Sequence, residues 1–294
     1  MARIVVPLDE SPLAEQSLPW AAGFARAAGH VLHLVSVCPS DSEFWESVDV
    51  DPESPINWAT ETVSAYLSGV ATNPDFHGLR VSTELRFGDV AGEITRVAAE
   101  PGTEMVVITS RGRGAGPAPG YGSVTVRLIR RLGVPVVVIP PESPVAKVNA
   151  ILVPLDGSPE AENALAFARP LARTLGAKVH LLTVLNPDIG PGIPEATGAR
   201  ATAVLADRAA EYLADRAVGE DERAIAWGRF SGTILNYARE HDCQLIAVST
   251  HGRGGAIQLE LGTTADAVIR EADRPVLLVP VRGQGSARAE PTTG

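Results

Sequence analysis

Apolar positions along this chain alternate between two kinds of segment. Short runs such as Ile4–Pro7 and Val136–Ile139 are wholly apolar, as expected for strands buried on both faces of a sheet. Between such runs, apolar residues recur at helical spacing, as in Pro12–Ala28, with Ser11 as a candidate N-cap and Gly29 as a candidate stop. Strands alternating with helices predict a parallel sheet with right-handed crossovers and helices on both faces.

The same alternation continues through the whole chain. A polar, Pro-rich stretch at 39–56 interrupts it and is predicted to be a loop. The further predicted strands are Val31–Val37, Val81–Phe87, Met105–Thr109, Ile151–Pro154, Val179–Leu185, Ala224–Phe230, Leu245–Ser249 and Val276–Val279. The further predicted helices are Trp58–Val70, Val90–Ala99, Val124–Leu132, Ala161–Leu175, Ala201–Ala217, Thr233–Glu240 and Ala265–Glu271.

A repeat of the N-terminal pattern divides the chain into two domains. The segment RIVVPLDESP begins at Arg3, and AILVPLDGSP begins at Ala150. A repeat period near half the chain length indicates tandem domains, not a solenoid. We expect a first domain at 1–140, a linker at 141–149, a second domain at 150–282 and a disordered, Gly/Ser/Ala/Thr-rich tail at 283–294.

Composition and charge narrow the function classes. The 294 residues carry a net charge of −10, which argues against nucleic-acid binding, because nucleic-acid binders usually present a basic face. We find no secretory signal pattern and no apolar run near the ~20 residues that span a bilayer, so we expect a cytoplasmic protein without a membrane partner. Cys38 and Cys243 lie at non-equivalent places in the two halves and are predicted to be buried apolar fillers.

A second repeated motif suggests phosphate binding. Val106–Pro140 and Ile246–Pro280 both contain an apolar strand, a small Gly/Arg loop, a glycine followed by hydroxyl residues, a helical pattern, and a proline before another strand. Glycine lets the backbone approach a ligand closely, and the N-terminus of the following helix favours an anion. We predict a phosphate cradle in each half; the alternative is a pair of Gly-rich turns with a helix cap.

Side chains in these loops could strengthen the binding of a phosphate. Arg111, Arg113 and Arg253 could donate charge-assisted hydrogen bonds, and His251 could contact a phosphate. The chain has no GxxxxGK[ST] motif, no metal-ligand spacing and no GxSxG motif. We therefore assign no catalytic and no metal-binding residues.

Two aspartates follow the first strand of their domains, whereas the Gly/Arg loops follow the fourth. Ligands of open parallel sheets bind beyond the carboxyl ends of the strands, where the strand order reverses. If the first and fourth strands are neighbours there, Asp9 and Asp156 each face a loop across one crevice and could accept a hydrogen bond from a ribose hydroxyl. The alternative is local, because Asp and Ser before proline form turns and caps without a ligand.

The remaining titratable residues are predicted to be structural. His33 and His180 fall within strands and are expected to be packed. The others are assigned to the solvated surface: His30, His77, His241, Glu93 and Glu260.

These motifs together resemble the universal stress protein family in its tandem form. The resemblance rests on the VPLD-x-S start, the Gly-x9-Gly-[Ser/Thr] segment and the proline before the apolar terminal strand of each half. It implies an α/β fold of two tandem Rossmann-like (adenine nucleotide alpha hydrolase-like) domains, each a five-stranded parallel sheet with helices on both faces. It also implies that Val136–Ile139 pairs with Val276–Val279 in an intramolecular pseudo-dimer, and that the chain could form a homodimer.

The resemblance further implies an ATP site in each domain. Where the ATP-binding branch of the family has its first motif glycine, this chain has Thr109 and Ser249, whose side chains would narrow the approach to the ribose and the α-phosphate. The expected ligand contacts in the first domain are Pro7, Leu8, Asp9, Val37, Thr109, Arg111, Gly112, Arg113, Gly122, Ser123 and Val124. Those in the second domain are Pro154, Leu155, Asp156, Val184, Ser249, His251, Gly252, Arg253, Gly262, Thr263 and Thr264.

Three functions are compatible with these observations. The first is a regulatory stress-response protein that binds ATP or a related adenine nucleotide without fast chemistry. The second is a slow ATPase or nucleotidyl transferase with Mg²⁺ held mainly by the phosphates. The third is an interaction scaffold with non-functional loops, which Thr109, Ser249 and the loop prolines Pro117 and Pro119 would favour. The sequence leaves open whether the nucleotide is ATP or a cyclic nucleotide.

Overall fold

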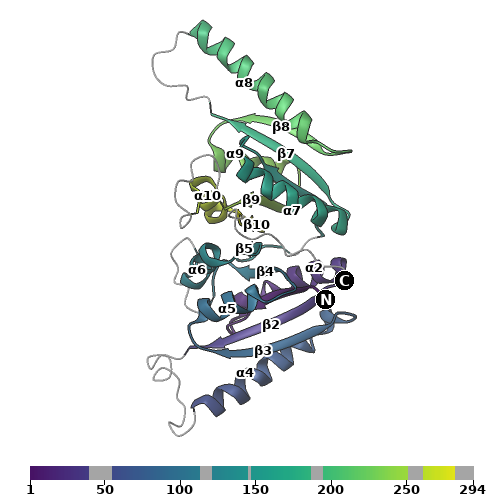
Figure 1. Ribbon diagram of the computed structural model, residues 1–294, viewed down its shortest axis with the longest axis vertical. Helices are drawn as coiled ribbons and strands as arrows, with labels where there is room; N and C mark the ends of the chain where they lie inside the picture. The colour runs from purple at the N-terminus through teal and green to yellow at the C-terminus, as the bar shows by residue number, and fades with distance from the viewer. Residues whose placement is uncertain (40–54, 113–120, 145–146, 187–194, 251–260, 282–294) are drawn as a thin grey trace, which may run out of the picture.

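A single ten-stranded sheet runs through the whole protein. The computed structural model describes residues 1–39, 55–112, 121–144, 147–186, 195–250 and 261–281. The strand order is β3-β2-β1-β4-β5-β10-β9-β6-β7-β8, so each domain contributes five adjacent strands and the two domains meet in the middle (Figure 1). All neighbouring strands are parallel except β5 and β10. The predicted fold class, α/β with tandem Rossmann-like domains, is confirmed.

The elements alternate as the sequence predicts, and most boundaries agree within a few residues. The first domain contains β1 (Arg3–Pro7), α1 (Pro12–Glu15), α2 (Leu18–Ala28), β2 (Val31–Cys38), α4 (Pro55–Ala71), η1 (Pro74–Phe76), β3 (Val81–Phe87), α5 (Val90–Ala99), β4 (Thr103–Thr109), α6 (Ser123–Arg131) and β5 (Val136–Ile139). The second contains β6 (Ala150–Pro154), α7 (Pro159–Leu175), β7 (Lys178–Leu185), α8 (Glu195–Arg216), β8 (Glu222–Trp227), α9 (Phe230–Glu240), β9 (Leu245–Ser249), α10 (Thr263–Glu271) and β10 (Val276–Val279).

Two predictions of local structure were wrong, each for a backbone reason. The predicted helix Pro12–Ala28 divides into α1 and α2, because Pro19 has no N–H to continue the helical bonds and Ser17 instead donates to the carbonyl of Ala14. Phe230 begins α9 and does not end β8, because Gly228 leaves the strand with a φ of 149°.

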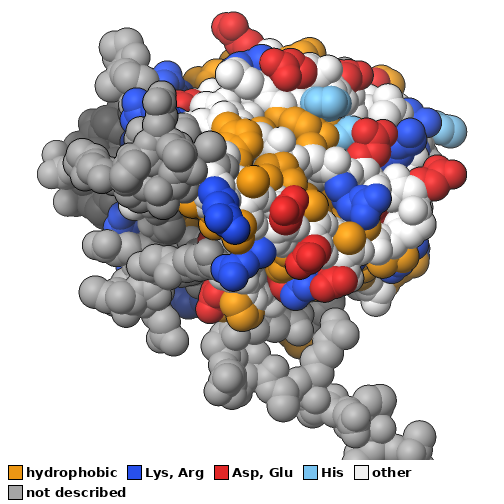
Figure 2. All heavy atoms as spheres, turned by 90° about the horizontal axis from the view of Figure 1, so that it is seen from above, with side chains coloured by type: hydrophobic (Ala, Val, Ile, Leu, Met, Phe, Trp, Pro, Cys, Tyr) orange, Lys and Arg blue, Asp and Glu red, His pale blue; other side chains and the backbone are white. Residues whose placement is uncertain are grey.

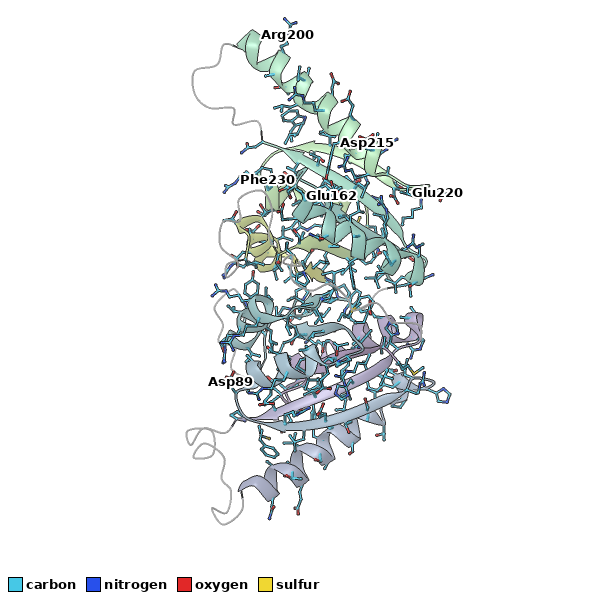
Figure 3. All side chains as sticks on the ribbon, viewed as in Figure 1. Asp89, Glu162, Arg200, Asp215, Glu220 and Phe230 are labelled. Atoms are coloured by element: carbon cyan, nitrogen blue, oxygen red, sulfur yellow. The ribbon has the colours of Figure 1, made fainter. Side chains whose placement is uncertain are left out.

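One interaction recurs at the same place in both domains. Tyr66 on α4 donates to Glu15 at 2.9 Å. Tyr212 on α8 donates at 3.2 Å to Glu162, which is labelled on α7 in Figure 3. Arg216 adds an ion pair to Glu162 at 2.9 Å. The duplicated sequence therefore anchors its longest crossover helix to the preceding helix in the same way twice.

The two domains share their hydrophobic cores. One core lies beneath α2, α4, α7 and α8, and the other lies beneath α5, α6, α9 and α10; both include residues from the two domains. At the seam, β5 and β10 pair antiparallel with Leu277 opposite Val137, and both strands are wholly buried. Tyr121 also donates across the seam to the carbonyl of Asp266 at 2.6 Å. This confirms the intramolecular pseudo-dimer.

The outer end of the second domain carries exposed apolar side chains. Figure 2 looks onto this end, where apolar atoms lie among acidic and basic side chains. Val204, Leu205, Trp227 and Phe230 are each more than a third exposed. Among the described residues, no helix is both long and apolar enough to cross a membrane.

Shortening a buried side chain where β5 meets β10 should destabilise both domains together. Leu277 is fully buried, so Leu277→Ala should lower the free energy of unfolding by about 2–5 kcal/mol in urea denaturation, with one shared transition. The exposed Val218→Ala should change it by about 0.5 kcal/mol or less. Two resolved transitions, only one of which shifts with Leu277→Ala, would contradict the shared core.

Candidate functional site

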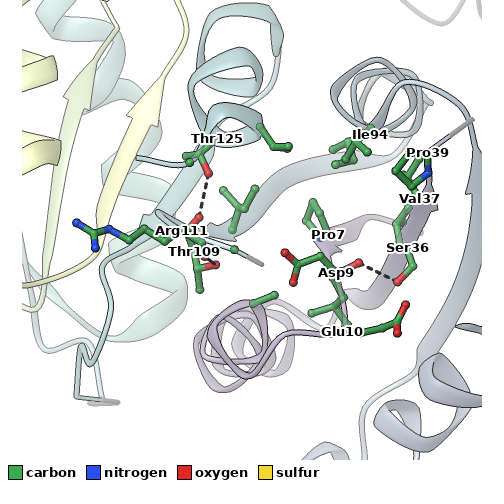
Figure 4. A pocket seen from close by; sticks show the side chains of 18 of the residues that line it. Pro7, Asp9, Glu10, Ser36, Val37, Pro39, Ile94, Thr109, Arg111 and Thr125 are labelled. Carbon is green, nitrogen blue, oxygen red and sulfur yellow. Dashed lines mark hydrogen bonds between the residues drawn. The ribbon is translucent and has the colours of Figure 1, made fainter. Parts of the chain in front are cut away.

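A cavity opens where the strand order of the first domain reverses. The chain passes from β1 to β2 on one side, whereas β4 lies on the other side of β1. The cavity has a volume of about 290 Å³ and lies at the carboxyl ends of these strands (Figure 4). Its lining includes every predicted contact of the first domain that the structure describes: Pro7, Leu8, Asp9, Val37, Thr109, Arg111, Gly112, Gly122, Ser123 and Val124. Arg113 lies outside the described residues.

The β1–α1 turn fixes the position of the Asp9 carboxylate. Its Oδ1 accepts hydrogen bonds from the backbone N–H of Ser11 at 3.1 Å and from the Ser11 hydroxyl at 2.5 Å. The same hydroxyl oxygen accepts from the N–H of Ala14 and so caps α1. The local role predicted for this motif is therefore confirmed, and the bonds from Ser11 both go to Oδ1. The other oxygen, Oδ2, lies toward the Gly/Arg loop.

Gly112 meets Asp9 across the cavity. A Cβ atom built on Gly112 would lie 2.4 Å from Asp9 Oδ2, a distance at which the carboxylate would have to move. Since the φ of Gly112 is not positive, this close approach, and not backbone strain, explains the glycine. The aspartate and the loop thus face one another as the sequence predicts, because β1 and β4 are neighbours.

The loop returns to its strand through backbone hydrogen bonds. Ser110 donates to the carbonyl of Ile139 and Gly122 donates to that of Ser110, both at 2.8 Å. Gly122 is then the N-cap of α6, and it has no side chain to occupy the first amides of that helix. A helix N-terminus without a side-chain cap offers N–H groups and a positive dipole end to an anion.

Thr109 does not close the cavity, although it replaces the family's first glycine. Its side chain is nearly buried, and its hydroxyl donates to the carbonyl of Arg111 at 2.7 Å. Thr125 donates in turn to the carbonyl of Thr109 at 3.2 Å. The threonine hydroxyl is thus hydrogen-bonded within the loop. The guanidinium of Arg111 points away from Asp9 in Figure 4.

The two sides of the cavity differ in charge. Asp9 and Glu10 line one side, with the N-terminus of α6 on the other. The phenol of Tyr66 lies close enough to sense these acids, and its pKa is raised, first by burial and then by Glu15, Asp9 and Glu10. Negative charge therefore gathers at the β1–α1 turn, so an anionic group fits better at the α6 side.

The apolar wall of the cavity was only partly foreseen. Val37 was predicted, whereas Val90 and Ile94 on α5 and Val63 on α4 were missed. Ser36 was also missed; it donates to the carbonyl of Leu8 at 2.8 Å. The apolar face of Val90–Ala99 was visible in the sequence, but nothing local indicates that two of its residues line a cavity. Glu93 on the same helix is buried and paired with Arg96, so its assignment to a solvated face was wrong.

The second domain repeats the described parts of this geometry. Asp156 Oδ1 accepts from the N–H and hydroxyl of Ser158 at 2.9 and 2.5 Å. Gly262 donates to the carbonyl of Thr250 at 2.8 Å and is the N-cap of α10. The other predicted residues at these strand ends and the helix start are Pro154, Leu155, Val184, Ser249, Thr263 and Thr264. His251, Gly252 and Arg253 lie outside the described residues, as does Glu260.

Comparisons with known proteins agree over nearly the whole chain. Proteins called universal stress proteins in Mycobacterium tuberculosis and Mycolicibacterium smegmatis are 29% and 28% identical over 288 and 298 residues. These alignments cover 94% and 95% of this chain, and 96% and 97% of the relatives. A universal stress protein structure from Archaeoglobus fulgidus has the same fold, with a TM-score of 0.72 at 21% identity over 95% of this chain and 98% of that one.

The sequence profile described as the universal stress protein family matches this chain twice, over residues 1–140 and 147–280. The two matches coincide with the two halves of the ten-stranded sheet. The chain therefore belongs to the universal stress protein family and carries two of its domains in tandem.

Proposed function

We propose that the protein is a regulatory stress-response protein that binds an adenine nucleotide, ATP, in the cavity of the first domain. The observation that carries this proposal is the contact between Asp9 and Gly112, which sets a carboxylate beside the amide-rich entry to α6. A ribose hydroxyl can donate to Asp9 Oδ2, while phosphates take the N-terminus of α6. Mg²⁺ would be held mainly through the phosphates.

The walls of the cavity suit a base and its sugar. Val37, Val90, Ile94 and Ile108 provide an apolar surface for a flat ring. The volume of about 290 Å³ lies near the lower end of small-ligand pockets. We infer that the nucleoside is enclosed and that the phosphate chain extends along the start of α6.

A second site in the other domain is part of the proposal. Its support is the repeated Asp156–Ser158 turn and the repeated start of α10 at Gly262. Asp156 is exposed, whereas Asp9 is only partly so. We expect the first domain to bind more tightly for this reason. The cytoplasmic location stays a prediction.

Adding one methyl group at Gly112 should weaken ATP binding. In Gly112→Ala the new Cβ displaces the Asp9 carboxylate, so the dissociation constant should rise roughly tenfold or more in isothermal titration calorimetry, with the fold preserved. Gly133→Ala is the matched control, because its Cβ would meet nothing within 4 Å. Equal affinity in Gly112→Ala and wild type, or no binding at millimolar ATP, would contradict the proposal.

The ribose contact can be tested separately. Asp9→Asn keeps an oxygen for Ser11 but changes the group that faces the ligand, so it should weaken ATP binding roughly tenfold. The same substitution should hardly change the affinity for 2′,3′-dideoxy-ATP, which lacks both hydroxyls. An equal loss for both nucleotides would show that Asp9 acts only through the fold. Phosphate release measured in parallel distinguishes binding from slow hydrolysis.

A further inference from the structure

Two histidines and a glutamate form a cluster in the second domain, at the end of the sheet away from the proposed nucleotide site. The ligand-type atoms of His180, Glu222 and His241 all lie within 4.8 Å of one another. His180 and Glu222 stand near the amino ends of β7 and β8, whereas the nucleotide site lies beyond the carboxyl ends. Five residues of extended strand separate His180 from the end of β7, roughly 16 Å. The cluster is therefore distinct from the proposed nucleotide site.

Three elements bring these side chains together. His180 and Glu222 are paired in register on adjacent parallel strands, so their side chains leave the sheet on the same face. The distance from His180 Nδ1 to Glu222 Oε2 is 3.8 Å. His241 follows α9 and stacks on Tyr237 with 4.0 Å between ring centroids, which holds it above His180. The assignment of His241 to the surface is confirmed, but the sequence did not indicate that His180 and Glu222 lie beside it.

The chemistry of the cluster suits a cation. Imidazole nitrogens and a carboxylate oxygen are donors that bind a divalent cation. The cluster also lies at the carboxyl end of α9, where the helix dipole favours positive charge. Lys178 lies 3.6 Å from Glu222, and a bound metal would replace this exposed ammonium as the partner of the carboxylate.

We propose that His180, Glu222 and His241 form a binding site for a divalent first-row transition metal, with Zn²⁺ as the representative ion. Two imidazoles and one carboxylate are ligands that Zn²⁺ accepts, and tetrahedral binding places ligand atoms roughly 3.4 Å apart. His180 is nearly buried. The Tyr237 hydroxyl lies 3.3 Å from the same Nδ1 of His180 that faces Glu222, and a metal on that nitrogen would displace it. Glu222 and His241 are exposed, so they can move the short distance inward.

The first domain serves as an internal comparison. His33 occupies the position of His180, but it pairs with Ser82 at 2.8 Å and Glu84 at 2.9 Å. The residues equivalent to Glu222 and His241 in the repeat are Ser82 and Pro101. The first domain thus also places a carboxylate beside its histidine, but among the described residues only the second domain adds a second histidine to such a pair.

Zinc binding to the full chain tests the proposal. After chelator treatment, titration calorimetry should give one Zn²⁺ per chain, and Mg²⁺ should not compete. Glu222→Gln and His241→Gln change exposed side chains and should each weaken Zn²⁺ binding at least roughly tenfold. His77→Gln, an exposed histidine of the first domain, should leave the affinity unchanged.

The outcomes are distinct from those of the nucleotide experiments. Zn²⁺ should also raise the melting temperature of wild type but not of His241→Gln, because a ligand that binds only the folded state stabilises it. The proposal would be overturned if the protein does not bind Zn²⁺, or if Glu222→Gln and His241→Gln both leave the Zn²⁺ affinity unchanged. It would also be overturned if His251→Gln abolishes Zn²⁺ binding in their place. None of these results bears on ATP binding at Asp9 and Gly112.

Discussion

The close packing of Gly112 against the Asp9 carboxylate is the constraint on which the site depends. The contact exists because β1 and β4 are neighbours, so that the chain leaves them in opposite directions and a crevice remains between their ends. Within it, the Ser11 cap fixes one oxygen of Asp9 and leaves the other toward the loop. The side of the site opposite Asp9 is therefore backbone: the loop after β4 and the start of α6.

The pairing of β5 with β10 determines the arrangement of the whole molecule. Each strand would otherwise be a short, apolar edge, which invites association with other chains. By covering each edge with the other domain, the duplicated chain makes one sheet with shared cores on both faces. The proposed nucleotide sites lie on either side of this seam. Tyr121, just before α6, donates a hydrogen bond across the seam to Asp266 in α10. These are the two helices that would receive the phosphates. A hydrogen bond therefore joins the two domains close to both proposed sites.

Much of this architecture could be predicted from the sequence, because buried parallel strands are short apolar runs and the duplication identifies equivalent residues. The placement of Asp9 opposite the Gly/Arg loop followed from one assumption, that β1 and β4 are neighbours, and the topology agrees with it. The other contacts of the first site came from the family resemblance. The apolar wall could not be predicted, since Val90 and Ile94 reach the cavity only through the packing of α5. His241 was missed for a similar reason: its companions, His180 and Glu222, are distant in sequence and meet through strand register.

The central claim is that backbone amides of the loop and of α6 bind nucleotide phosphates opposite Asp9. The most direct measurement is an amide NMR titration of the isotopically labelled protein with ATP. The account predicts saturable shifts of the Gly112, Gly122, Ser123 and Val124 amides, with smaller changes when adenosine replaces ATP. Shifts confined to other parts of the chain, or equal shifts at these amides with adenosine, would contradict it.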